Sequence, residues 1–304
     1  MRVHLVGLGA VGAGYGSKIL AAGHDLQVIA AADRAERYRT TVTTVNGVDY
    51  RFGAIEPAQA QQADVVIVAV KSPALDDAIG LLDSSVGPGT VILSLLNGVD
   101  SERILAEAFP HAHVLLSVTV GIDAVRLGRE IRYTSLGRIV FGELPPAQPG
   151  AAVATLASLL ASSDIAYEVS TDMVHQLWWK FLINVGVNQV SAVLKAPYRL
   201  FQFADSPARA AMIAAQREVI AVAQAEGVDL DEADIDAWLA VLAQLGPDNY
   251  TSMAQDALAG RETEVGIFAV RVCELGRRHG VQTPVNELLA LLLAAGTLRD
   301  RDDA

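Results

Sequence analysis

The 304-residue sequence predicts an α/β Rossmann-type N-terminal domain, residues 1–170, followed by an all-α C-terminal domain, residues 171–304. Three observations predict this fold class. Short apolar runs alternate with helical segments in the first half, a glycine cluster follows the first run, and only helical patterns follow residue 171. Such alternation is typical of a parallel sheet covered by helices. The length is sufficient for two domains, each with its own core.

The predicted strands of the first half are rich in Val, Ile and Leu, as expected for strands buried on both faces of a sheet. They are Val3–Val6, Leu26–Ala30, Val65–Val70, Val91–Leu95, Val114–Val118, Arg138–Phe141 and Ile165–Val169. A turn-rich spacer, Leu144–Gly150, and a helix over residues 151–163 precede the last of these strands.

The second half has helical periodicity and no strand pattern. Its predicted helices cover residues 172–190, 207–227, 231–244, 249–259, 262–280 and 285–295. Ser206-Pro207 and Thr283-Pro284 indicate helix starts, because in each a capping residue precedes a proline in the first turn.

The composition excludes several function classes. The formal net charge of −12 disfavours nucleic acid and an anionic membrane as partners. No apolar stretch approaches the roughly 20 residues of a membrane-spanning helix, and the N-terminus does not have the pattern of a secretory signal. The single cysteine, Cys273, excludes an internal disulfide, and the six histidines show no metal-ligand spacing. We therefore expect a soluble, cytoplasmic protein without a bound metal.

A motif of the form G-x-G-x-x-G follows the first predicted strand and opens a helical segment. Its residues are Gly7, Leu8, Gly9, Ala10, Val11 and Gly12. In this context the first glycine permits a tight turn, the second lets a pyrophosphate approach the backbone, and the third lets helix and strand pack closely. The helix start adds unpaired N–H groups for phosphates. The motif predicts dinucleotide binding, and a glycine-rich turn without a ligand is the alternative.

The residues after the second predicted strand bear on the choice between NAD and NADP. An acid in this region favours the free ribose 2′-hydroxyl of NAD, whereas an arginine favours the 2′-phosphate of NADP. Asp33 therefore indicates NAD, while Arg34 and Arg37 indicate NADP. We expect NADP with Arg34 as a ligand, and NAD stays possible.

Three polar residues follow one another at steps of four in an otherwise apolar helical segment: Lys180, Asn184 and Asn188. This spacing puts them on one helix face. A lysine and two amides are costly to bury unless polar groups meet them, and a ligand cleft between the two domains would provide such groups. The alternative is a solvent-facing stripe on an amphipathic helix.

A second polar cluster begins at Asn249 and Ser252 and continues to Glu264. By itself it is equally compatible with a capped helix start followed by a solvated acidic turn.

These motifs, taken in order, resemble the 2-dehydropantoate 2-reductase, or ketopantoate reductase, family. The resemblance covers nearly the whole chain. It rests on the glycine motif, Val70-Lys71, Leu96-Asn97-Gly98-Val99, Trp179-Lys180-Phe181 with Asn184 and Asn188, and Asn249, Ser252, Met253 and Asp256 with Glu264. It implies a Rossmann domain followed by an all-helical domain, and a homodimer.

The resemblance also implies a role for each matching residue. Lys180 corresponds to the family's general acid, and Glu264 to the acid that supports the substrate and the lysine. Substrate-binding positions correspond to Asn184, Asn188, Asn249 and Ser252, and positions beside the nicotinamide to Lys71 and Asn97. One departure is visible. Family members that use NADP often carry an arginine where this sequence has Ala31.

The leading hypothesis is therefore reduction of 2-dehydropantoate to pantoate with a nicotinamide cofactor and a lysine general acid. One alternative is an NAD-dependent 2-hydroxyacid dehydrogenase that acts on another branched 2-keto acid, since any such substrate needs a carboxylate clamp and a proton donor. Another alternative is a non-catalytic sensor that binds a dinucleotide.

Overall fold

The computed structural model describes residues 1–144 and 148–302, with side chains as far as Gly296. The chain divides into two compact units, Met1–Val174 and His175–Ala304. The division falls four residues after the predicted boundary at residue 170. Part of the predicted spacer Leu144–Gly150, residues 145–147, lies outside the described residues.

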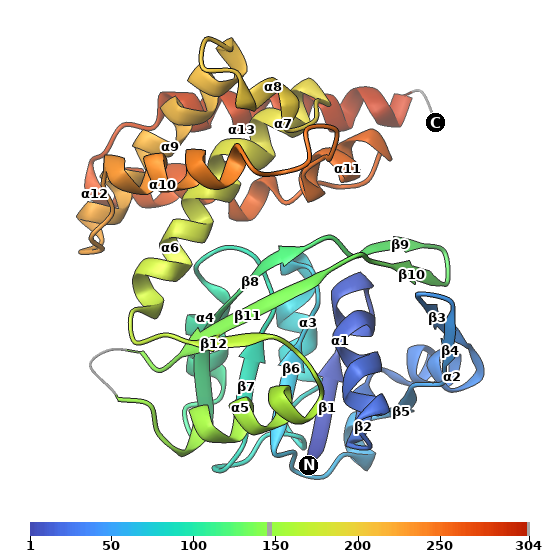
Figure 1. The fold of residues 1–304 in the computed structure, drawn as a ribbon. Coiled ribbons are helices and arrows are strands. Elements are labelled where there is room, and N and C mark those ends of the chain that lie inside the picture. The colour runs from blue at the N-terminus through green and yellow to red at the C-terminus, as the bar shows by residue number, and fades with distance from the viewer. Residues whose placement is uncertain (145–147, 303–304) are drawn as a thin grey trace. The chain divides into compact units, whose positions relative to one another are not determined.

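The first unit contains an eight-stranded sheet with the order β12-β11-β8-β7-β6-β1-β2-β5 (Figure 1). Neighbouring strands are parallel except β8 and β11, which pair antiparallel. The strands are β1 Arg2–Val6, β2 Asp25–Ile29, β5 Gly53–Ile55, β6 Val65–Val68, β7 Val91–Ser94, β8 His113–Ile122, β11 Leu136–Gly142 and β12 Tyr167–Val169. From β1 the chain continues to β2 and β5 on one side of the sheet, and then crosses to β6 on the other side of β1. The strand order therefore reverses between β1 and β6, and sheets of this kind bind ligands beside the C-terminal ends of the strands at such a switch point.

The seven strands predicted from the sequence are all present, with shifted ends. The continuous apolar run of β6 is explained by burial on both faces: Val65 and Ile67 belong to one core, and Val66 and Val68 belong to the other. β6 ends two residues earlier than predicted, and β8 extends to Ile122.

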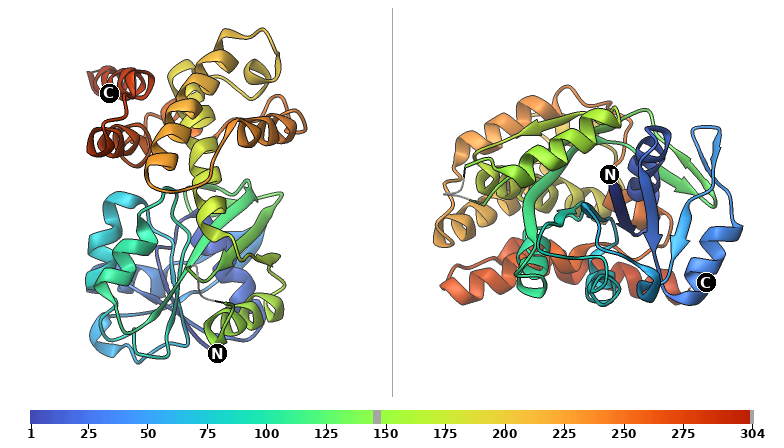
Figure 2. Two further views of the ribbon diagram at one scale, coloured as in Figure 1. Left: turned by 90° about the vertical axis from the view of Figure 1, so that its left-hand side faces the viewer. Right: turned by 90° about the horizontal axis from the view of Figure 1, so that it is seen from below.

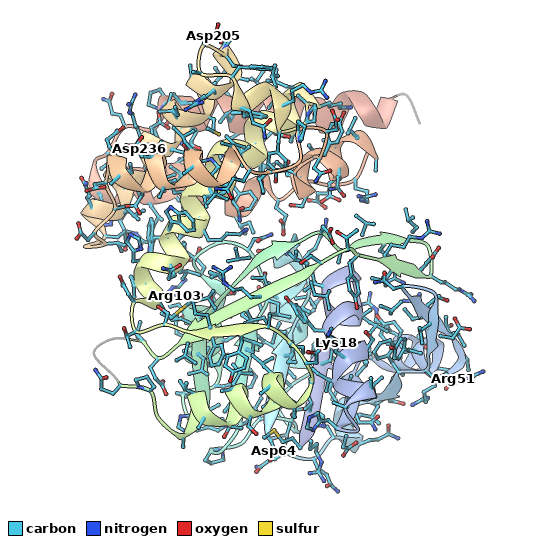
Figure 3. All side chains as sticks on the ribbon, in the orientation of Figure 1. Lys18, Arg51, Asp64, Arg103, Asp205 and Asp236 are labelled. Atoms are coloured by element: carbon cyan, nitrogen blue, oxygen red, sulfur yellow. The ribbon has the colours of Figure 1, made fainter. Side chains whose placement is uncertain are left out.

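Helices cover both faces of this sheet (Figure 2). The core on one face includes residues of α1 and α5, and the core on the other includes residues of α3 and α4. Lys18 of α1, labelled in Figure 3, forms an ion pair of 2.7 Å with Asp164, just after α5. The helices of this unit are α1 Ala10–Ala21, α2 Ala32–Thr40, α3 Leu75–Gly80, α4 Ser101–Ala108 and α5 Ala151–Ser162, with 3₁₀ turns η1 Pro57–Gln59 and η2 Ser72–Ala74.

A second, four-stranded sheet with the order β4-β3-β10-β9 was not predicted. Its strands are β3 Thr43–Val45, β4 Val48–Tyr50, β9 Val125–Leu127 and β10 Glu130–Arg132. Strands of three residues are too short to show an alternating pattern. One signal was nevertheless present: Asn46-Gly47 joins β3 to β4 with positive φ at both residues (46° and 80°), as two-residue hairpin turns require.

The second unit contains only helices and turns among its described residues. They are α6 Met173–Ile183, a π-helical turn η3 Asn184–Asn188, α7 Gln189–Leu194, α8 Arg199–Gln202, α9 Pro207–Ala225, α10 Glu232–Leu242, α11 Ser252–Leu258, a 3₁₀ turn η4 Val265–Ile267, α12 Ala269–His279 and α13 Pro284–Asp302. The prediction of an all-helical second half is confirmed. α9 and α13 begin at the two prolines that the sequence indicated, and the Ser206 hydroxyl accepts the N–H of Ala208.

Two predicted helix starts were wrong. The helix predicted over 262–280 begins only at Ala269, because a 3₁₀ turn precedes it and Phe268 has a non-helical backbone (φ −111°, ψ −95°). α11 begins at Ser252, not at residue 249, because Thr251 caps it: its hydroxyl accepts the N–H of Ala254 at 3.1 Å.

No helix in residues 1–144 and 148–302 is long and apolar enough to cross a membrane. In the same part of the chain, no group of three or more His, Cys, Asp or Glu side chains is arranged to hold a metal ion.

One buried carboxyl group lies in the first turn of α4. Ser101 donates to Glu102 Oε2 at 2.8 Å, while the other oxygen, Oε1, has no hydrogen-bond partner among the described residues. Ser94 completes the chain of hydroxyl groups, at 2.8 Å from Ser101. Burial raises the pKa of Glu102 to about 7, so the fold favours its protonated form.

We expect Glu102→Gln to stabilise the protein at pH 8 and to have little effect near pH 4. The folded pKa exceeds the ordinary value of 4.5, so the unfolded state releases this proton first and the free energy of unfolding falls as pH rises from 4.5 to 7. The shift corresponds to about 3 kcal/mol as an upper bound. Urea unfolding at both pH values measures the effect, and an equal effect at the two would contradict the assignment.

Candidate active site

The glycine motif forms the turn between β1 and α1, and two of its glycines are required by packing. Gly7 has φ of +98°, and a Cβ there would lie 2.5 Å from the carbonyl oxygen of Ala69. A Cβ on Gly12 would lie 2.0 Å from the Gly7 carbonyl oxygen. Both obstacles are backbone atoms, so neither position can accept a side chain without moving the loop against the end of β6.

Gly9 differs, because a Cβ there would meet nothing within 4 Å. It is the N-cap of α1, and no side chain caps this helix start. The first N–H groups of a helix have no intrahelical partner, and they carry a partial positive charge. Open space beside Gly9 and N–H donors at Ala10 and Val11 fit the diphosphate of a dinucleotide. Leu8 is buried beneath this turn.

Two further predicted cofactor residues lie at the same edge of the sheet. Lys71 follows the C-terminal end of β6, directly before η2, and is exposed. Asn97 follows the C-terminal end of the neighbouring strand β7 and precedes Gly98, which has φ of +96°. Because β1, β6 and β7 are adjacent and parallel, these residues and the glycine motif gather at one edge.

The residues that bear on the choice between NAD and NADP lie at the start of α2. Asp33 and Arg34 are both exposed in the first turn of α2, and Ala31 is its N-cap. Arg37 lies over the ring of Tyr38 at 5.9 Å. The acid that would favour NAD and the arginine that would favour NADP therefore remain equally accessible.

In the second unit, Lys180 lies in the last turn of α6, and Asn184 and Asn188 are the first and last residues of η3. Asn188 Nδ2 donates to Asn184 Oδ1 at 3.3 Å, so the structure brings the two amides together. They are only 3% and 7% exposed. The alternative of a solvent-facing stripe is therefore wrong for the two asparagines.

The π-helical turn was not predicted, and a close packing contact accompanies it. A Cβ on Gly186 would lie 2.5 Å from Gln216 Cγ on α9. Glycine at this position lets α9 approach the widened turn. Single π turns of this kind are frequent at functional sites.

A buried glutamine that sequence reasoning missed ties the same turn to two other helices. Gln189 Nε2 donates to the Val185 carbonyl at 2.8 Å and to Asn286 Oδ1 on α13 at 3.2 Å. Gln189 Oε1 accepts the N–H of Ala269, the first residue of α12, at 2.9 Å. Gln189 thus satisfies a carbonyl within the π turn and fixes the backbone that carries the two asparagines.

Lys180 has an unusual environment for a cation. In the part of the chain that the structure describes, its Nζ makes no hydrogen bond or ion pair. Burial lowers the pKa of Lys180, and no charged neighbour contributes to the shift. An ammonium group with a lowered pKa releases its proton more readily than an ordinary lysine.

The remaining predicted residues lie on α11 and near η4. Asn249 and Ser252 are exposed at the start of α11, and this helix packs against α7 and η3. The Thr251 hydroxyl, which sequence reasoning missed, also donates to Ser191 Oγ on α7 at 3.2 Å. Glu264 is half-buried directly before η4. The unit therefore brings the start of α11 to the helix that carries the asparagines.

Substitution of single glycines separates the two uses of the motif. We expect Gly9→Ala to fold like the native protein and to weaken dinucleotide binding at least tenfold, because the methyl group enters space that the diphosphate needs. We expect Gly12→Ala to lower the midpoint of thermal unfolding, because its methyl group meets backbone. Calorimetric titration with NADH and NADPH, and thermal melts of both variants, check these outcomes. Normal dinucleotide affinity in Gly9→Ala would contradict the assignment of the loop.

Comparisons with known proteins agree with this arrangement. The family models for "Ketopantoate reductase PanE/ApbA" and its C-terminal part match residues 3–146 and 172–296. A 2-dehydropantoate 2-reductase of Halobacterium salinarum is 30% identical over 240 residues, which are 79% of this chain and 78% of that protein.

Two solved structures share the fold. D-mandelate dehydrogenase, solved with NADH and anilino(oxo)acetate, has a TM-score of 0.88 and 21% identity, with 99% of each chain covered. A dimeric ketopantoate reductase from Staphylococcus aureus has a TM-score of 0.81 and 20% identity, with 99% of this chain and 100% of that chain covered. The matched family models and the Halobacterium relative confirm the predicted resemblance: the chain belongs to the ketopantoate reductase PanE/ApbA family.

Proposed function

We propose that this protein reduces 2-dehydropantoate to pantoate with a nicotinamide dinucleotide, and that Lys180 is the proton donor. The observation that carries the proposal is a half-buried lysine whose pKa is lowered by desolvation, on the same helical run as two buried asparagines; among the described residues this lysine has no hydrogen-bond or ion-pair partner. Family membership and the glycine motif of the other unit support an oxidoreductase that uses this class of cofactor.

A nicotinamide dinucleotide, when bound, supplies the hydride for the substrate's C2 carbonyl. We assign its diphosphate to the glycine motif Gly7–Gly12 and its nicotinamide end to the neighbourhood of Lys71 and Asn97. NADPH is our first choice, with Arg34 as the ligand of its 2′-phosphate, and NADH is the alternative because Asp33 is equally exposed.

The substrate's C2 oxygen gains negative charge as the carbonyl is reduced. The ammonium group of Lys180 stabilises that charge and transfers its proton to the oxygen. The lowered pKa of Lys180 reduces the cost of this transfer.

We assign the remaining polar residues to the substrate. Amide groups both donate and accept hydrogen bonds, so Asn184, Asn188 and Asn249 suit a carboxylate and a hydroxyl group together. Ser252 adds a hydroxyl at the start of α11, and Glu264 supports the substrate and the protonated lysine once both are in place.

We further propose that the enzyme is a cytoplasmic homodimer. The Staphylococcus aureus relative is described as dimeric. On α13 of this chain, Leu288, Leu291 and Leu292 are 57%, 69% and 45% exposed, which gives the helix an apolar side available to a second subunit.

The rival proposal has the same hydride transfer to a 2-keto acid but a substrate other than 2-dehydropantoate. The shared fold of D-mandelate dehydrogenase, which was solved with NADH, favours an NAD-dependent 2-hydroxyacid dehydrogenase acting on another branched 2-keto acid. A non-catalytic dinucleotide sensor is the other rival, and such a protein would need neither Lys180 nor Glu264.

We expect Lys180→Ala to reduce kcat by roughly 10²- to 10⁴-fold, the range that general acids contribute, while the Kd for the dinucleotide stays within about threefold of the native value. Steady-state kinetics and calorimetric titration measure the two quantities. Lys195→Asn, which removes a cation from the same unit at a left-handed helix end (φ 49°), is the control and should retain kcat. Near-native kcat in Lys180→Ala would rule out the proposed proton donor.

A panel of 2-keto acids with both cofactors separates the proposals for function. The panel contains 2-dehydropantoate, 2-ketoisovalerate and phenylglyoxylate, each with NADH and with NADPH, compared by kcat/KM. We expect the highest value for 2-dehydropantoate, because its additional hydroxyl group matches the asparagine pair. A higher value for either of the others would favour the rival dehydrogenase, and no turnover with any keto acid would favour the sensor.

A further inference from the structure

Arg126 brings a positive charge to the glycine motif from the four-stranded sheet. It lies on β9, the edge strand of that sheet. Its Nη1 donates to the carbonyl oxygen of Leu8 at 2.6 Å, and its Nε donates to that of Gly128 at 2.8 Å. Figure 1 shows the β9–β10 hairpin beside one end of α1, which is consistent with this contact between distant parts of the sequence.

The hairpin that carries Arg126 is held firmly in place. Ile131 on β10 is fully buried in the core that also contains Ala13 of α1 and Val45 of β3. The side chain of Asn46 accepts the N–H of Tyr133 at 2.9 Å and donates to the Tyr133 carbonyl at 3.0 Å. The Arg126 side chain is exposed, and its guanidinium is oriented by its hydrogen bonds to the Leu8 and Gly128 carbonyls.

The recorded contacts of Arg126 leave its charge uncompensated. Both acceptors are neutral carbonyl groups, and among the described residues no carboxylate pairs with this guanidinium. A guanidinium has five N–H donors, of which these bonds use two. Arg132, on the same hairpin, is different, because its Nε and Nη2 donate to the two carboxylate oxygens of Glu130.

A fixed cation beside a helix start is suited to an anion. The α1 N-terminus lacks a side-chain cap, and the space next to Gly9 is open. Arg126 brings its guanidinium to this turn, because it bonds the carbonyl of Leu8, the residue before Gly9. The chain carries a net charge of −12, which repels a polyanionic ligand at long range. A local positive charge at the motif offsets that repulsion.

We infer that Arg126 is a cofactor-binding residue that donates hydrogen bonds to the diphosphate of the dinucleotide held at Gly7–Gly12. The inference rests on the proposed dinucleotide binding and adds a ligand from outside the motif. The diphosphate is favoured over the ribose 2′-phosphate because Leu8 lies within the turn that opens α1. The residues that distinguish NADP from NAD, Asp33 and Arg34, lie in the first turn of α2.

Calorimetric titration of purified protein with NADH, NADPH and ADP-ribose tests this inference. In Arg126→Ala we expect all three ligands to bind roughly 10- to 100-fold more weakly, as for the loss of charged hydrogen bonds. Arg126→Lys keeps the charge without the planar fork, and we expect an intermediate loss. The weakening should diminish at high salt, where native binding is itself screened.

The matched control is Arg51→Ala. Arg51, labelled in Figure 3, is exposed just after β4 of the same small sheet, so this variant removes one positive charge without touching the motif. Native affinity in Arg51→Ala together with the common loss in Arg126→Ala supports the inference. Thermal melts of all variants identify a folding defect. If Arg126→Ala is defective in folding, the affinity of Arg126→Lys tests the inference instead, because lysine preserves a donor for the Leu8 carbonyl.

Two results would overturn the inference. Native affinity for all three ligands in Arg126→Ala would show that the arginine only braces the Leu8 carbonyl. A loss confined to NADPH would assign Arg126 to the 2′-phosphate instead of the diphosphate. Failure of the native protein to bind any of the three ligands would instead overturn the proposed dinucleotide site itself, so the two failures are distinguishable.

Discussion

The desolvation of one half-buried ammonium group is the constraint on which the candidate site depends. Lys180 carries no ion pair in the described part of the chain, and its desolvation favours the neutral amine. Desolvation of a cation costs stability. The helical run that carries Lys180 continues into the π turn, where Gln189 joins η3 to α12 and α13 and Gly186 lets α9 pack close to the turn.

The candidate sites of the two units differ in the groups that they offer to a ligand. In the first unit the glycine motif has no side chains at three positions: neighbouring backbone atoms exclude a Cβ at Gly7 and Gly12, and Gly9 leaves open space at a helix start. In the proposed cofactor site the donors are therefore main-chain groups, to which Arg126 adds a positive charge. The second unit instead concentrates polar side chains on an apolar helix. Main-chain donors are suited to a cofactor that many enzymes share, whereas a particular set of polar side chains is suited to one substrate.

Strands, turns and helix starts that depend on the local sequence pattern could be predicted. Continuous apolar runs located β1, β6 and β7, the glycine spacing located the turn before α1, and Ser206-Pro207 located the start of α9. Lys180, Asn184 and Asn188 were found because steps of four stand out in an apolar segment. In the structure, the side chains of Asn184 and Asn188 are joined by a hydrogen bond.

Features that depend on contacts distant in the sequence were not predictable. The strands β3, β4, β9 and β10 are each three residues long, so the sheet that carries Arg126 left no periodic signal. The π turn requires Gln189 to reach Asn286 and Ala269, some 80 to 97 positions away. Periodicity predicted one helix over residues 172–190, since an inserted π turn preserves the helical pattern on either side. The early start predicted for α12 failed because hydrophobicity alone does not reveal a 3₁₀ turn.

The ionisation of Lys180 is the most direct test of this account. The chain has four lysines, Lys18, Lys71, Lys180 and Lys195, so an NMR titration of the Cε resonances in protein with isotope-labelled lysine is readily resolved, and Lys180→Arg assigns the signal. We expect Lys180 to titrate below its ordinary pKa of 10.5. Titration of Lys180 at or above 10.5 would contradict the desolvated ammonium group and, with it, the proposed proton donor.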